Sequence, residues 1–212
     1  MDIKKYFDNI DKDILFQILK RKITDKKLLR LLQEIIYSNC TKEELENASS
    51  KRKGLPIGNY TSQIFANIYL NELDQYIKHS LKGKYYFRYL DDMILLVETK
   101  KEAKMCLKKI KEFLKVYLEL ELNEKTQIFK SKQGVNFCGY KINEYRLKIR
   151  DKGKRRLKKK IKELKCLIKN GKINSKEAKK YLAGHIGYIH YANIRNLTKK
   201  IFYIMRDKSK GQ

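Results

Sequence analysis

Two adjacent carboxylates interrupt an apolar, aromatic stretch in the segment KYYFRYLDDMILLV, residues 84–97. The runs on either side predict two strands that pair as a hairpin, with Asp91 and Asp92 at its tip. Aspartate is common in turns, but neither Asp-Gly nor Asn-Gly, the pairs that suit a two-residue hairpin, is present. Adjacent like charges repel each other, and a divalent cation such as Mg²⁺ removes that repulsion. The pattern leaves two interpretations open, an ordinary turn and a metal site.

A third carboxylate, Asp2, lies in the segment MDIKKYFDNI, at the end of an apolar-led stretch that then enters a helix. Phosphoryl transfer with two metal ions needs the ions about 3.5–4 Å apart, bridged by carboxylates from different strands. Asp2 on one strand and Asp91 on a neighbouring hairpin would supply that bridge. Taken singly, Asp2 is better interpreted as a solvated N-terminal acid, so the metal interpretation depends on the two residues meeting.

Net charge points to a polyanionic partner. The 212 residues carry a formal charge of +27, and Lys and Arg that neutralise phosphates release counterions. Residues 141–212 hold 24 Lys and Arg against 5 Asp and Glu, whereas residues 1–140 hold 27 against 19. An even lysine bias would not load one third of the chain so heavily. We therefore expect nucleic acid as the partner and no membrane, because the basic region has no Trp or Phe-rich face for lipid.

Cysteine usage favours a reducing, cytoplasmic environment. The four cysteines are scattered, with no C-x-x-C pair, so neither a disulfide framework nor a zinc site is expected. No run of about 18 apolar residues is present that would form a membrane-spanning helix.

Periodicity predicts an α+β region followed by an all-helical one. Helices are expected over residues 10–23, 26–37, 61–79 and 100–117, with a polar loop over residues 38–59. Short strands are expected over residues 126–129, 135–142 and 146–149. Helices are then expected over residues 157–168, 176–191 and 193–206. Charge and secondary structure change together near residue 150, where we place a domain boundary.

Five segments occur in the order of the reverse transcriptase motifs A to E, and the chain resembles that family from residue 1 to about residue 150. The segments are MDIKKYFDNI, GLPIGNYTSQIFANIYL, RYLDDMILL, LELNEKTQI and VNFCGYKI. The resemblance implies a right-hand polymerase palm over residues 1–150, a small antiparallel sheet packed on helices. The basic helical region, residues 151–212, resembles the thumb.

The same resemblance implies template-directed extension of a DNA primer on RNA, using dNTPs. In the family, the motif A aspartate and the first aspartate of Y-x-D-D bind two Mg²⁺ ions, for which Mn²⁺ can substitute. Here these are Asp2 and Asp91, with the carbonyl of Ile3 completing the metal shell and Asp92 supporting the site. Lys125 matches a proton donor to pyrophosphate, although it is as readily a surface lysine.

Further roles follow from matching motif positions. Phe7 matches the bulky gate under the sugar of the incoming nucleotide, where an aromatic ring excludes a 2′-hydroxyl and favours dNTPs. That role is compatible with its ordinary interpretation as a core aromatic. Motif B is expected to contact the nucleotide and template base through Ile57, Gly58 and Gln63. The expected primer grip is Phe137, Cys138, Gly139 and Tyr140, and the expected nucleic-acid-binding residues are Arg155, Arg156, Lys158, Lys159 and Lys160.

Motif B also indicates a subfamily. It reads I-G-N-Y-T-S-Q where group II intron enzymes usually have Q-G-x-x-x-S-P. This version resembles reverse transcriptases of diversity-generating retroelements, which copy a template RNA with frequent errors at adenines and work with a basic accessory protein. A group II intron maturase-like enzyme is the alternative.

Family members usually have a fingers region before motif A, where this sequence begins. We therefore expect the fingers to be largely missing. A second function of a different class follows, namely a catalytically incompetent palm–thumb fragment that binds template–primer nucleic acid.

Overall fold

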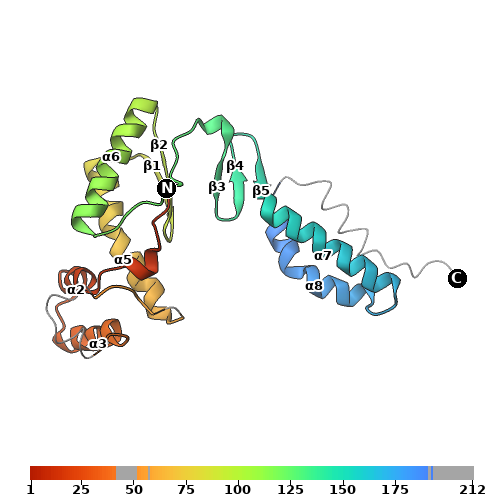
Figure 1. Cartoon of the computed structure of the whole chain (residues 1–212), viewed down its shortest axis with the longest axis horizontal. Coiled ribbons are helices and arrows are strands. Elements are labelled where there is room, and N and C mark those ends of the chain that lie inside the picture. The colour runs from red at the N-terminus through yellow and green to blue at the C-terminus, as the bar shows by residue number, and fades with distance from the viewer. Residues whose placement is uncertain (42–51, 57, 191, 193–212) are drawn as a thin grey trace. The chain divides into compact units, whose positions relative to one another are not determined.

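The computed structural model describes residues 1–41, 52–56, 58–190 and 192, and it divides into two compact units, Met1–Ile128 and Phe129–Gln212. Both units combine helices with a small antiparallel sheet (Figure 1), in agreement with the predicted α+β class. The division falls earlier than the boundary expected near residue 150. The strands between residues 135 and 149 therefore belong to the same unit as the helices that follow them.

Capped helices make up most of the first unit. They are α1 (Tyr6–Asn9), α2 (Lys12–Lys20), α3 (Lys26–Tyr37), α5 (Tyr60–Gln75) and α6 (Lys100–Tyr117), with a π-helical turn η1 (Tyr76–Ser80) after α5. The side chains of Asp11, Asp25 and Thr99 accept hydrogen bonds from backbone N–H groups in the first turns of α2, α3 and α6, which fixes where these helices begin. The predictions for residues 26–37 and 100–117 are confirmed.

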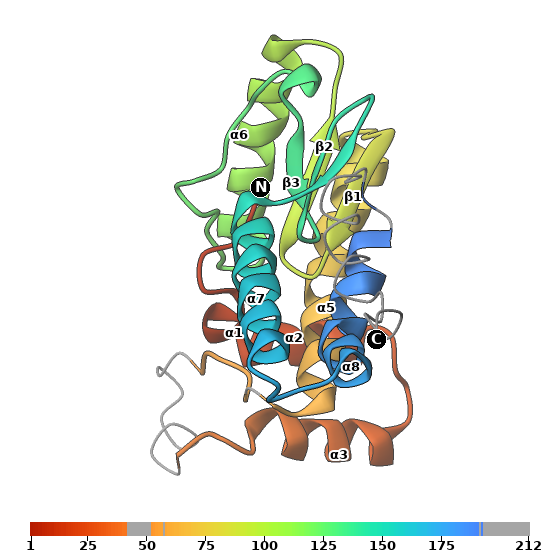
Figure 2. The ribbon, with the colours of Figure 1, turned by 90° about the vertical axis from the view of Figure 1, so that its right-hand side faces the viewer.

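The predicted hairpin is present as β1 (Tyr85–Tyr89) paired antiparallel with β2 (Asp92–Leu96). Strand alternation places Tyr85, Phe87 and Tyr89 on an exposed face, whereas Met93 is fully buried. Helices α5 and α6 lie beside this hairpin (Figure 2), and α5 also packs on α2. The hairpin is thus supported on its inward face by the helical core.

The first residues of the chain extend this small sheet. The main-chain nitrogen of Met1 donates to the Met93 carbonyl at 2.7 Å, and the Met93 N–H donates to the Met1 carbonyl at 2.8 Å. On the opposite edge, Ile3 forms an antiparallel bridge with Leu122. Residues 1–4 therefore lie between β2 and residues 121–123, although they are too short to be assigned as a full strand.

The second unit is a three-stranded meander followed by a helical hairpin. Its strands are β3 (Val135–Phe137), β4 (Tyr140–Ile142) and β5 (Leu147–Ile149), preceded by the 3₁₀ turn η2 (Ser131–Gln133). Helix α7 (Asp151–Lys169) packs on α8 (Ser175–His190). The buried core residues of this unit are Ile149, Leu157, Ile161, Leu164, Ala178 and Leu182.

Several predicted elements differ in the structure. The strand expected over residues 126–129 is wrong, because these residues have no regular structure after a turn at Asn123. The strand expected over residues 135–142 is a hairpin, since Cys138 and Gly139 both have positive φ, 47° and 86°, as a two-residue primed turn requires. The helix expected over residues 193–206 lies outside the described residues. Among the described helices, none is long and apolar enough to cross a membrane.

Candidate active site

The β1–β2 turn positions one of the two adjacent aspartates. Tyr89 pairs with Asp92, so Leu90 and Asp91 are the two turn residues and Asp92 begins β2. Leu90 has φ 54°, in the left-handed region that costs a non-glycine residue roughly 1–2 kcal/mol. Its carbonyl accepts a hydrogen bond from Nη1 of Arg88 at 3.0 Å. The turn is therefore held in an uncommon conformation by a side chain from the preceding strand.

Asp2 reaches the same region from the start of the chain. Its carbonyl accepts the Asn123 N–H at 2.7 Å, and its Oδ2 accepts from Nδ2 of Asn123 at 3.1 Å. Asn123 thus holds both the backbone and the carboxylate of Asp2. The Met1–Met93 pairing on the other side aligns Asp2 with the end of the hairpin.

Asp2 and Asp91 meet. Burial raises the pKa of Asp91, and the negative charge of Asp2 and a side-chain hydrogen bond with it raise the pKa further, while the backbone N–H of Asp91 itself acts in the opposite direction. The hydrogen bond requires the two carboxyl groups to lie side by side. Two half-buried like charges in contact favour a proton or a cation between them.

These donors suit a hard divalent cation. Mg²⁺ is typically bound through one or two carboxylates together with substrate phosphates. The backbone hydrogen bonds that flank Ile3 are made by Asp2 and Lys4, so the Ile3 carbonyl is not one of their acceptors. Within the described residues, no group of three or more His, Cys, Asp or Glu lies close enough to hold a metal. The structure therefore unites Asp2 with Asp91 and does not add Asp92 to them.

Sequence comparison identifies the family. Residues 1–142 match the family model described as reverse transcriptase (RNA-dependent DNA polymerase). The chain belongs to the reverse transcriptase family.

Curated relatives of this reverse transcriptase include intron-encoded proteins. A COX1/OXI3 intron 2 protein of Saccharomyces cerevisiae is 25% identical, over 67% of this chain and 23% of the relative. Protein YkfC of Escherichia coli is 28% identical, over 66% and 45%. The group II intron-encoded protein LtrA of Lactococcus lactis is 29% identical, over 66% and 34%. The chain spans less than half the length of each of these three relatives.

Other predicted residues of the reverse transcriptase lie in the first unit at varied distances along the chain. Lys125 is exposed, and its N–H donates to Oδ1 of Asn123, the residue that holds Asp2. Phe7 is half-buried in α1, edge-on to the ring of Tyr6 at 5.7 Å between centroids. Gly58 has φ 107°, which a side-chain-bearing residue rarely adopts.

Gln63 is exposed in the first turn of α5, where motif B begins its helix. Ile57, the residue on which the subfamily prediction rests, lies outside the described residues. The structure therefore leaves the contacts of motif B with a nucleotide as a prediction.

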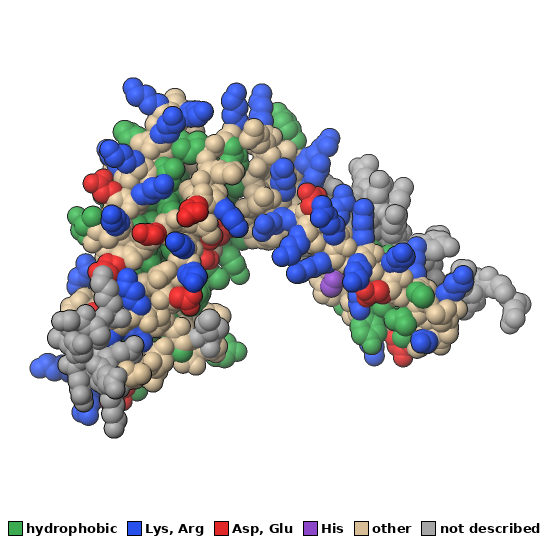
Figure 3. Space-filling view, in the orientation of Figure 1, with side chains coloured by type: hydrophobic (Ala, Val, Ile, Leu, Met, Phe, Trp, Pro, Cys, Tyr) green, Lys and Arg blue, Asp and Glu red, His purple; other side chains and the backbone are tan. Residues whose placement is uncertain are grey.

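The predicted nucleic-acid contacts lie in the second unit. Phe137, Cys138, Gly139 and Tyr140 form the β3–β4 turn and its flanks, with Cys138 exposed. Lys and Arg side chains gather over α7 (Figure 3), where Arg155, Arg156, Lys158 and Lys159 are exposed. Lys160 differs, because it pairs with Glu163 at 3.6 Å and lies 5.6 Å from the ring centroid of Tyr181.

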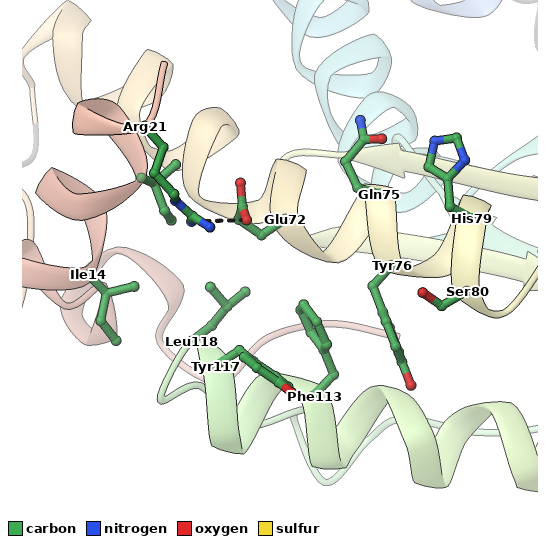
Figure 4. A pocket seen from close by; sticks show the side chains of 11 residues that line it. Ile14, Arg21, Glu72, Gln75, Tyr76, His79, Ser80, Phe113, Tyr117 and Leu118 are labelled. Carbon is green, nitrogen blue, oxygen red and sulfur yellow. Dashed lines mark hydrogen bonds and ion pairs between the residues drawn. The ribbon is translucent and has the colours of Figure 1, made fainter. Parts of the chain in front are cut away.

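A cavity of about 430 Å³ lies elsewhere in the first unit, between α2, α5, η1 and α6 (Figure 4). It is lined by the stacked rings of Tyr76 and Phe113, 4.3 Å apart, and by the ion pair of Arg21 with Glu72 at 3.1 Å. None of the predicted site residues lines it. The carboxylate pair, and not this cavity, is therefore the candidate active site.

Sequence analysis missed the residues that hold the two carboxylates in place. Arg88 interrupts an apolar strand, and period-two alternation puts it on the same inward face as Tyr86, so its burial was predictable. Asn123 carries no comparable signal, because it is separated from Asp2 by 121 positions. Only the folded chain shows that the two residues meet.

Proposed function

We propose that the chain is the palm and thumb of a reverse transcriptase that extends a DNA primer on an RNA template by two-metal nucleotidyl transfer. The observation that carries the proposal is the contact between Asp2 and Asp91, two carboxylates from segments far apart in the sequence. Such a pair is what bridging two divalent cations requires. Membership of the family supports the same conclusion.

In this proposal Asp2 and Asp91 hold two Mg²⁺ ions, with the Ile3 carbonyl as a further ligand and Asp92 alongside. Bound Mg²⁺ would lower the pKa of the primer 3′-hydroxyl and stabilise charge on the departing pyrophosphate. The 3′-oxygen forms a bond to the α-phosphorus as the bond to pyrophosphate breaks. Lys125, two residues from the Asp2 partner Asn123, is proposed to give a proton to that pyrophosphate.

The remaining roles concern substrates. Phe7 is proposed to exclude the 2′-hydroxyl, and Gly58 and Gln63 to contact the incoming nucleotide. In the second unit, the β3–β4 turn is proposed to hold the primer end. The exposed cations of α7, residues 151–169, are proposed to bind duplex phosphates, which gives the palm as residues 1–150 and the thumb as residues 151–212.

The test is primer extension on an RNA template with dNTPs and Mg²⁺ or Mn²⁺, using the chain and its Asp91→Asn variant. The variant keeps the shape of the side chain but removes charge, so extension should be abolished while affinity for the template–primer duplex is retained. Asp8→Asn, an exposed carboxylate on α1, is the matched control and should extend normally.

A correctly folded wild-type chain that binds the duplex without extending it would overturn this proposal. It would favour the second candidate, a template–primer-binding fragment, for which the exposed cations of α7 are the supporting observation. Loss of binding and extension together in Asp91→Asn would show misfolding, which circular dichroism detects.

We also propose that synthesis is error-prone and serves a retroelement. Three relatives are named as intron proteins, whereas the motif B sequence favours the diversity-generating type with its basic accessory protein. Ile57 can only pack, while glutamine both donates and accepts hydrogen bonds. Ile57→Gln should therefore lower misincorporation several-fold opposite template adenine, as measured by sequencing the products. An unchanged error spectrum in an active variant would remove the physical basis of this prediction.

A further inference from the structure

The guanidinium of Arg88 uses its whole set of donors within the first unit. Nε and Nη2 donate to the two carboxylate oxygens of Asp74, Nη1 donates to Oδ1 of Asn67 at 2.9 Å and to the Leu90 carbonyl at 3.0 Å, and Nη2 also approaches the Asn67 carbonyl at 3.5 Å. An arginine carries five N–H donors in a planar fork. Every one of them therefore has an acceptor here.

The acceptors on the far side of this fork are fixed in α5. Asp74 and Asn67 lie two turns apart on that helix, and Asp74 also accepts from the Tyr86 hydroxyl at 2.8 Å. The Arg88 and Asp74 side chains are only 13% and 15% exposed. A half-buried bidentate pair with a third partner is more rigid than a surface ion pair.

The near side of the fork reaches the peptide bond that joins Leu90 to Asp91. The carbonyl of this peptide accepts from Arg88, and its N–H, which belongs to Asp91, acts on the Asp91 carboxylate. One rigid peptide plane thus connects the guanidinium to the candidate metal ligand. Leu90 is held at φ 54°, a conformation that needs such support.

We propose that Arg88, anchored by Asp74 and Asn67, is a positioning residue that fixes the Asp91 carboxylate against Asp2 for divalent-cation binding. The role rests on the proposed polymerase function for its biological meaning, but not for its test. A metal ligand must be held to within a fraction of an ångström of its productive place, and residues that lock it tune affinity about 10- to 100-fold. Helix α5, which carries motif B, is thereby coupled to the turn that carries Asp91.

Lysine at this position separates positioning from charge. Arg88→Lys retains a positive charge against the buried Asp74 carboxylate, so the ion pair survives, but an ammonium has three donors and no planar fork. It cannot hold the Asp74 carboxylate in two places and also reach Asn67 and the Leu90 carbonyl. A role in stability alone would be largely rescued by lysine, whereas a positioning role would not.

A second variant removes the pair without leaving a buried charge. Arg88→Met combined with Asp74→Leu replaces it by apolar side chains of similar volume, which is often tolerated. The matched control is Arg21→Met combined with Glu72→Leu, an ion pair on the same helix α5 at the cavity and away from the turn.

The experiment measures three quantities on the full chain. They are amide hydrogen exchange at Asp91, Mn²⁺ affinity by electron paramagnetic resonance, and primer extension separated into kcat and KM. For both Arg88 variants we expect faster exchange at Asp91, Mn²⁺ affinity about tenfold weaker, and a fall in kcat with an unchanged dissociation constant for the duplex. The control pair should match the wild-type chain in all of them.

Wild-type exchange and Mn²⁺ affinity in Arg88→Lys would overturn the inference, as would equal losses in the control pair, which would indicate a general effect on the fold. A wild-type chain that fails to extend primers would refute the proposed function alone. Exchange at Asp91 and Mn²⁺ affinity would still decide the role of Arg88.

Discussion

The contact between Asp2 and Asp91 predicts that the candidate active site costs the fold stability at neutral pH. Both carboxylates are half-buried and lie within hydrogen-bonding distance of each other. Asp91→Asn removes one charge, keeps the shape, and lets the amide donate a hydrogen bond to Asp2. We therefore expect this variant to be more stable than the wild-type chain near neutral pH.

The magnitude follows from Coulomb's law. Two unit charges about 4 Å apart repel by about 1 kcal/mol in water and by about 4 kcal/mol at an effective dielectric constant near 20. Because both groups are partly exposed, solvent screening places the effect toward the lower value. A gain of about 1–2 kcal/mol in the free energy of unfolding is the expected result.

The sign of the pH dependence gives a second test. The pKa of Asp91 is raised in the folded state, so the folded chain binds more protons than the unfolded one as pH passes from the ordinary value to the raised one. Wild-type stability falls with rising pH in that window, and the Asn variant does not share the loss. The difference between the two should thus be small at about pH 4 and reach its full size by about pH 7.5.

Urea unfolding followed by circular dichroism at both pH values measures this difference, with and without Mg²⁺. Mg²⁺ that binds only the folded wild-type chain stabilises it by about 1.4 kcal/mol at roughly ten times the dissociation constant, which narrows the gap. Asp8→Asn, the exposed control, should lie within about 0.5 kcal/mol of wild type. A variant less stable than wild type near neutral pH, or a gap independent of pH, would show that Asp2 and Asp91 are not in contact.

Three further predictions concern binding, selectivity and the second unit. Neutralising Lys158 and Lys159 should lower the log–log salt slope of duplex-DNA binding by about 0.9 for each phosphate that is no longer neutralised, whereas neutralising Lys160, which is already paired, should change the slope less; equal effects would contradict the structure. Phe7→Ala should admit rNTPs in primer extension, and continued exclusion of rNTPs would remove the gate role. Gly134→Ala should destabilise the second unit by about 2 kcal/mol in thermal unfolding, because φ is 75° and a Cβ would lie 2.9 Å from a strand carbonyl; an unchanged melting temperature would refute the strain argument.

Local pattern was enough to predict much of the fold. Apolar spacing predicted α3 and α6 with their observed bounds, and the two apolar runs around Asp91 predicted the hairpin. These features are encoded within a few turns or strands, where side-chain periodicity reports directly on which face is buried. Charge distribution likewise predicted a basic helical end, whose exposed cations lie on α7. The order of five short motifs indicated the family, which the match over residues 1–142 confirms.

Tertiary structure decided which residues meet. The pairing of Met1 with Met93 and of Asp2 with Asn123 brings together groups that are about a hundred positions apart, and no local periodicity encodes such contacts. The strand predicted over residues 126–129 failed for a related reason, since its β propensity had no partner to pair with among the described residues. The five-donor fork of Arg88 is likewise a property of a helix and a hairpin packed together, because each acceptor becomes fixed only when α5 and the turn are both in place.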